Sequence, residues 1–254
     1  MPIKSVVFLL ASALWALGET RTWTSAEGKQ LEAEFVKADK SGVTVRKAGG
    51  ESVLIPLNRL SDEDWLYAGR MAEEQKARDE AGKKVEAEAA AKDKLLKGPL
   101  TYQLSGGSEK WPEDRKKRIV DAMEAAITFL NEHGDFKKNV TANNSPGTPT
   151  ADANYDGWIN WGGSINRRVA LHEIGHTLGI GTHPDWQKNI KDGKWTGKHA
   201  LKQLREFDGE KAELHADRMH FWPYGLNFDN ESSTENDKRF VKMVAAFRKD
   251  LGIR

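Results

Sequence analysis

The sequence predicts an α+β protein in which a long helix joins a small β module to a larger mixed module. Three observations predict this architecture: residues 19–60 alternate apolar and polar positions in short runs, residues 61–97 are rich in Ala, Glu and Lys, and residues 98–254 combine strand-like and helix-like periodicities. At 254 residues, the chain is long enough for one sizeable core and a smaller module.

The first 18 residues have the pattern of an export signal. Lys4 supplies a positive charge, and residues 6–17 are almost entirely apolar. Ala16 and Gly18 are small enough for signal cleavage, and an apolar run of about a dozen residues is too short to span a bilayer comfortably. We therefore expect residues 1–18 to be a cleaved signal peptide. The mature protein is then secreted or periplasmic, without stable membrane insertion.

Composition excludes several classes of chemistry. The chain has 39 Lys and Arg against 38 Asp and Glu, a formal net charge of +1, which gives no electrostatic reason to expect nucleic acid or an anionic membrane as a partner. It has no cysteine, which excludes thiol catalysis, cysteine-ligated zinc and a lipoprotein-type cysteine anchor. Without disulfides, an exported protein depends on packing and on any metal that it binds.

Residues 19–60 predict a small antiparallel β domain. Leu31, Ala33 and Phe35 share one face of a strand, and Ser41-Gly42 marks the turn that follows. Similar alternating runs continue to the end of this stretch. The simplest arrangement is a barrel of four or five strands.

Residues 21–65 resemble a bacterial version of the SHD-type (Sla homology) domain, which has an SH3-like fold. The resemblance is carried by Trp23, Gly28, Phe35, Pro56 and the closing Leu60-Ser61 with Asp64. It implies a docking module that binds a protein or surface ligand and performs no chemistry. The alternative is a structural spacer with nothing bound.

A helical connector is predicted over residues 61–97. Ser61, followed three residues later by Asp64, forms a capping box that opens the helix. Residues 72–94 contain few large apolar side chains and no apolar repeat at the spacing of about 3.5 residues that a coiled coil needs. We therefore expect the middle of this helix to be a solvated connector.

The larger module, residues 98–254, has a mixed pattern. Residues 136–156 are rich in Asn, Pro, Thr and Gly, which predicts loops with at most a short strand near Val140. The other predicted elements are a strand over Leu100 to Leu104, a helix over Pro112 to His133, a strand over Trp158 to Trp161, a helix that starts near Ile165, and a closing helix with Phe240, Val244, Phe247 and Leu251 at helical spacing.

The segment His172-Glu173-Ile174-Gly175-His176 carries the strongest chemical signal in the chain. Histidines four apart on a helix lie on one face, so two imidazole nitrogens can bind one metal ion. Glu173 lies beside them, where a carboxylate can act as general base for a metal-activated water. The alternative is a pair of buried histidines with ordinary hydrogen bonds. The apolar helical context and a helix-ending Gly179 disfavour it.

The text HEIGHTLG resembles the zinc helix of the metzincin metallopeptidases. In that family a third histidine lies three residues after the glycine, but here that position is Thr182 and the histidine follows at His183. Gly181 can absorb the extra residue through an unusual backbone angle. His183 is therefore the preferred third ligand.

A second candidate ligand lies in residues 214–227. Met219-His220-Phe221 resembles the Met-turn of metzincins, which implies that Met219 supports the site and that Tyr224 stabilises an oxyanion. The text HFWPYGLN also resembles a signature of secreted bacterial proteins with an HExxH helix, in which His220 is itself the third ligand. We expect His183 first, His220 as the alternative and His215 as the least favoured, because spacing alone leaves all three open.

These features predict a zincin-like domain over residues 98–254 of a secreted, zinc-dependent endopeptidase that acts on protein or peptide substrates. On this hypothesis Zn²⁺ polarises the scissile carbonyl, and Glu173 activates the water and passes its proton to the leaving amine. The strand Trp158 to Trp161 occupies the place where metzincins pair with the substrate backbone. The alternative is an exported binding or adhesion protein that holds zinc structurally, which leaves Glu173 without a role.

Overall fold

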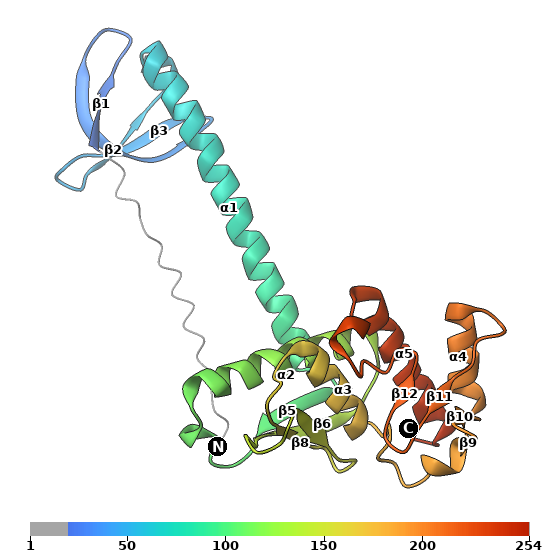
Figure 1. Cartoon of the computed structure of the whole chain (residues 1–254). Coiled ribbons are helices and arrows are strands. Elements are labelled where there is room, and N and C mark those ends of the chain that lie inside the picture. Colours follow the sequence, from blue (N-terminus) through green and yellow to red (C-terminus); the bar gives the residue numbers. More distant parts are fainter. Residues whose placement is uncertain (1–19, 254) are drawn as a thin grey trace. The chain divides into compact units, whose positions relative to one another are not determined.

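The structure is a computed structural model that describes residues 20–253 (Figure 1). The predicted signal peptide, residues 1–18, lies outside the described residues. The chain divides into two compact units, one up to Glu88 and the other from Ala89 onward. Helices and small sheets together confirm the predicted α+β class. Across residues 20–253, each helix is too short or too polar to cross a bilayer.

The N-terminal unit contains an antiparallel sheet of strand order β1-β2-β3-β4. Its elements are β1 (Thr20–Thr24), β2 (Gln30–Asp39), β3 (Gly42–Arg46), β4 (Ser52–Ile55) and a 3-10 turn at Leu57–Arg59. Its core holds Trp23, Ala33, Val43 and Val45, because alternate strand residues point to the same side. The Trp23 indole donates a hydrogen bond to the carbonyl of Ala33 at 3.1 Å. The predicted alternation thus produces a four-stranded sheet.

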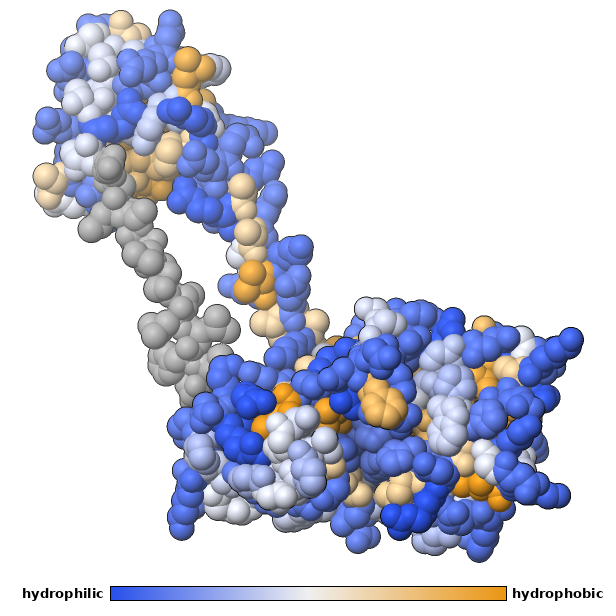
Figure 2. Space-filling model, in the orientation of Figure 1, coloured by the Kyte–Doolittle hydropathy of each residue, from blue (hydrophilic) through white to orange (hydrophobic). Residues whose placement is uncertain are grey.

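The connector is a single helix, α1 (Asp62–Leu96). The Ser61 hydroxyl accepts a hydrogen bond from the backbone N–H of Asp64 at 3.3 Å, as a capping box predicts. The Asp64 carboxylate also accepts hydrogen bonds from the Thr24 N–H and the Arg21 guanidinium, so it ties the start of the helix to β1. Most other side chains of α1 are exposed, and its surface is mainly hydrophilic (Figure 2).

The C-terminal unit is built on a mixed sheet of strand order β5-β6-β8-β7. Its strands are β5 (Leu100–Leu104), β6 (Lys138–Asn144), β7 (Ala151–Ala153) and β8 (Trp158–Trp161). β5, β6 and β8 run parallel, and β7 pairs antiparallel with β8 at the edge. One face of this sheet is covered by two helices (Figure 1), α2 (Glu113–His133) and α3 (Arg167–Thr177).

Two predictions about this sheet need correction. Residues 136–156 contain more strand than predicted, because the strand at Val140 is the seven-residue β6 and the edge strand β7 follows it. β7 reads Ala-Asp-Ala and lacks the β-branched and aromatic side chains that mark a strand in a sequence. The strand Trp158–Trp161 has no free edge, since β6 and β7 flank it on both sides. The free edge on this side of the sheet belongs to β7.

The rest of the C-terminal unit contains a small antiparallel sheet, β12-β11-β10-β9, and two further helices. The predicted closing helix is confirmed as α5, which buries Phe240, Val244 and Phe247. α4 packs against α5 and lies in a stretch where the sequence predicts no helix. The elements not yet given are β9 (Ile190–Lys191), β10 (Lys194–Trp195), α4 (Lys198–Asp208), β11 (His215–Ala216), β12 (Phe221–Trp222), α5 (Thr234–Asp250) and 3-10 turns at Ser108–Lys110, Gln187–Asn189 and Asp229–Glu231.

Candidate metal centre

α3 carries the HExxH segment into the core of the C-terminal unit. The Asn166 side chain caps the helix by accepting a hydrogen bond from the Val169 N–H at 2.9 Å. The helix packs so closely on α5 that a β-carbon added at Gly175 would lie 2.8 Å from the ring of Phe240. The glycine inside the motif therefore permits the packing that holds the two histidines in place.

His172 and His176 face each other across one turn of α3, with 3.1 Å between their Nε2 atoms. Each Nδ1 lies against a backbone carbonyl, that of Gly225 at 2.9 Å for His172 and that of Ile180 at 2.8 Å for His176. Because a carbonyl only accepts, each Nδ1 carries the proton and each Nε2 presents a lone pair. Burial lowers the pKa of His172 to about 3 and that of His176 to about 4. Two facing lone pairs repel each other unless a cation lies between them.

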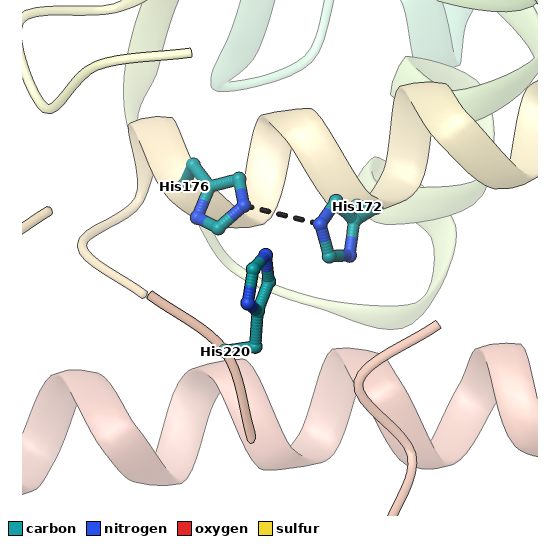
Figure 3. Close-up of side chains that lie close together, drawn as sticks. All are labelled: His172, His176 and His220. Atoms are coloured by element: carbon teal, nitrogen blue, oxygen red, sulfur yellow. Dashed lines mark hydrogen bonds between the residues drawn. The ribbon is translucent and has the colours of Figure 1, made fainter. Parts of the chain in front are cut away.

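His220 completes the cluster. One nitrogen each of His172, His176 and His220 lies within 4.8 Å of the other two. Figure 3 shows the three rings converging, two from α3 and one from the segment between β11 and β12. The Asp217 carboxylate holds this segment by accepting hydrogen bonds from the N–H groups of Met219 at 2.8 Å and His220 at 2.6 Å.

Of the candidate third ligands, the structure brings His220 to the pair and leaves His183 apart from it. His183 lies outside the cluster, where its Nδ1 accepts a hydrogen bond from the Asp185 N–H at 3.1 Å. Its ring packs edge-on against Tyr155, with 5.0 Å between centroids. The chain leaves α3 through positive φ angles at Gly179 (117°) and Gly181 (69°), and this turn directs His183 away from the pair.

His215 and Tyr224 also lie apart from the cluster. The His215 ring stacks on Trp222, with centroids 5.9 Å apart. The Tyr224 hydroxyl donates a hydrogen bond to Asp208 at 2.7 Å and accepts one from Arg239, and Tyr224 does not line the cavity at the histidines. The hydroxyl that the sequence predicts for an oxyanion contact is thus hydrogen-bonded to a charged pair outside the cavity.

Glu173 is buried beside the histidine pair, with 5% of its surface exposed. Its Oε2 atom is buried and has no hydrogen-bond partner. Burial raises the pKa of Glu173 to about 7, with a further contribution from Asp152, while Arg168 acts in the opposite direction. A buried carboxylate without a partner is costly to stability, so its presence indicates a functional use.

A cavity of about 770 Å³ opens on the cluster. Its walls come from β7, from α3 and from the segment 217–231, and Glu173 and Met219 both line it. Asp152 and Asp217, which were not among the predicted site residues, also line this cavity. Asp217 lies two residues before Met219, the spacing of an Asx turn, which is a local signal for the turn that presents His220. Asp152 carries no local signal, because only the sheet pairing of β7 brings it to α3.

These residues fit a divalent transition metal. Three imidazoles converge, two are held in the tautomer that leaves Nε2 free, and the open side faces a cavity with a carboxylate beside it. The three nitrogen donors leave a fourth coordination position open toward the cavity. Comparison with protein-family models, with curated proteins and with solved structures gives no match for this chain.

Proposed function

We propose that this protein is a zinc-dependent endopeptidase with a zincin-like C-terminal domain and His172, His176 and His220 as the metal ligands. The observation that carries the proposal is the convergence of three imidazoles on an open cavity beside a buried, unpartnered Glu173. Zinc suits three neutral nitrogen ligands in a chain without cysteine. Export to a secreted or periplasmic location belongs to the same proposal and rests on the apolar residues 6–17.

The chemistry assigned to the chain's own residues is proton transfer by Glu173. A bound zinc ion supplies Lewis acidity toward the scissile carbonyl. Glu173 accepts a proton from the attacking water and then donates it to the leaving amine. Burial raises the pKa of Glu173 in the metal-free protein, and a bound dication would act in the opposite direction, so the carboxylate would be ready to accept a proton at neutral pH.

The free edge of β7 is the proposed contact for the substrate backbone. The backbone N–H of Asn154 bonds to the carbonyl of Trp158, and the N–H of Gly162 bonds to the carbonyl of Thr150. Alternation along an antiparallel pair then directs the N–H and C=O groups of Ala151 and Ala153 away from β8, toward the free edge. An extended peptide can add to this edge as a further strand. We therefore assign the substrate contact to β7 instead of β8, the strand for which the sequence predicts it.

The alternative function, a binding protein with a structural metal, is less well supported. A structural zinc site is closed by four protein ligands, whereas the cluster here has three histidines and a cavity. A structural metal site would also give no function to Glu173, whose buried Oε2 has no hydrogen-bond partner.

The test is Glu173→Gln in the mature protein. Glutamine keeps the shape and is not a metal ligand, so zinc content should stay near one per chain while cleavage of casein and of a peptide library falls by about 10²-fold or more. Glu109→Gln, at an exposed position outside the cavity, is the matched control and should leave cleavage unchanged. A Glu173→Gln variant as active as the wild type would overturn the mechanism.

A further inference from the structure

The cavity carries more negative than positive charge. Its charged lining side chains, apart from the histidines, are one cation and four carboxylates: Arg168, Asp152, Glu173, Asp217 and Glu231. Arg168 is already neutralised, because its guanidinium lies 2.7 Å from the Asp229 carboxylate and also donates a hydrogen bond to the carbonyl of Leu226 at 3.1 Å. A divalent ion bound to the neutral histidines would add two positive charges. The cavity would keep an excess of negative charge, because four carboxylates line it.

Asp152 is held in place by a ladder of polar side chains across the sheet. Ser105 donates a hydrogen bond to Asn143 at 2.8 Å, and Asn143 donates one to Asn160 at 2.9 Å. Asn160 in turn donates its amide to Asp152 at 2.9 Å. The strand register aligns Asn143 with Asn160 and Asn160 with Asp152. The ladder orients the carboxylate of Asp152 without supplying a cation, so its charge stays uncompensated.

Glu231 is oriented in a similar way on the other wall. Its Oε2 accepts a hydrogen bond from the backbone N–H of Asn227 at 2.8 Å. Within residues 20–253, Asp152 and Glu231 take part in no ion pair. The cavity is also lined by two solvent-exposed aromatic side chains, Phe228 with 69% and Trp222 with 42% of its surface exposed. Carboxylates beside exposed aromatic rings fit the charged head and the apolar stem of a long cationic side chain.

We propose that this cavity selects a Lys or Arg side chain of a peptide substrate, with Asp152 and Glu231 as the specificity-determining residues. That the cavity receives a ligand is indicated independently by Glu173, which lines it, is 95% buried and has an unpartnered Oε2. The inference rests on the proposed function and names its substrate class. It requires cationic peptides to bind more tightly than neutral or anionic ones of the same length.

The experiment measures peptide binding to zinc-loaded Glu173→Gln protein, which separates recognition from cleavage. Fluorescence anisotropy compares labelled peptide pools that differ only in carrying Lys, Gln or Glu at each position in turn. We expect the best Lys pool to bind about tenfold more tightly than the matching Gln pool, and the Glu pool to bind most weakly. Raising NaCl from about 0.05 to 0.5 M should reduce the difference, because salt screens exposed charges.

Adding Asp152→Asn and Glu231→Gln to this protein should reduce the Lys-to-Gln difference to less than about threefold while the zinc content stays the same. Adding Asp121→Asn, on the exposed surface of α2, is the matched control and should leave the difference intact.

Equal binding of all three pools, or a preference that survives both neutralising substitutions, would overturn the inference. If the wild type cleaves peptides without a charge preference, the inference fails and the hydrolase proposal stands. If Lys pools bind selectively but the wild type never cleaves them, the hydrolase proposal fails and the cation preference of the cavity stands.

Discussion

The carbonyl oxygen of Met219 occupies the space where a side chain at residue 181 would begin, since a β-carbon on Gly181 would lie 2.0 Å from it. Gly181 also has a φ of 69°, which side chains disfavour. The segment after α3 and the segment that presents His220 are therefore in backbone contact. This contact brings the third histidine to the HExxH pair.

Gly181→Ala should weaken metal binding although residue 181 is not a ligand. The new methyl group must displace the Met219 backbone, and with it His220, so we expect zinc affinity to fall by about tenfold or more. Gly209→Ala is the matched control, because Gly209 also has a positive φ (92°) but open space around its β-carbon position. Both variants place a side chain at a positive φ, which costs about 1 kcal/mol of stability, and Gly181→Ala should lose more because of the backbone clash. Calorimetric titration with zinc should separate the two variants. Equal zinc affinities would show that the contact does not position His220.

Single alanine substitutions distinguish the third ligand. His172→Ala and His220→Ala should each lose bound zinc, because two remaining imidazoles hold the ion weakly. His183→Ala should retain it, since His183 packs against Tyr155 outside the cluster. Elemental analysis after dialysis against a weak chelator checks this. Zinc retained in His220→Ala and lost in His183→Ala would contradict the structure.

The metal-free protein should show the titration of Glu173 in its stability. Burial raises the folded-state pKa from the ordinary 4.5 to about 7, so the folded protein holds this proton over a range where the unfolded chain releases it. Relative to Glu173→Gln, the unfolding free energy of the wild type should therefore fall as pH rises from about 4.5 to 7, by on the order of 3 kcal/mol. Urea denaturation of both proteins with chelator present gives this difference. A difference that stays constant across this range would rule out the raised pKa.

The last turns of α1 should stabilise the C-terminal unit. Lys92 pairs with Glu124 at 2.9 Å, and the Asn131 amide donates hydrogen bonds to the carbonyls of both Leu95 and Leu100 at 2.8 Å. We expect the fragment 89–254 to fold and to melt several degrees above the fragment 98–254, which lacks the first two of these contacts. Thermal denaturation by circular dichroism compares them. Identical melting temperatures would place the boundary of the unit after α1.

The sequence by itself determined the elements whose signals are local. The helices α2, α3 and α5 follow from apolar periodicity, and α1 follows from its capping box and its Ala-, Glu- and Lys-rich composition. The pairing of His172 with His176 follows from the geometry of one helical turn. The strands of the N-terminal unit follow from alternation in the same way. Each of these signals is complete within a few consecutive residues.

Only the tertiary structure decided which distant groups meet at the site. The choice of His220 over His183 depends on the close approach of Gly181 to Met219, and the position of Asp152 depends on β7 pairing at the edge of the sheet. Tyr224 has no local signal for its partner Asp208, which belongs to α4. Such contacts join residues far apart in the chain, where spacing carries no information. They arise from backbone packing, which places Glu173 and the three histidines around one cavity.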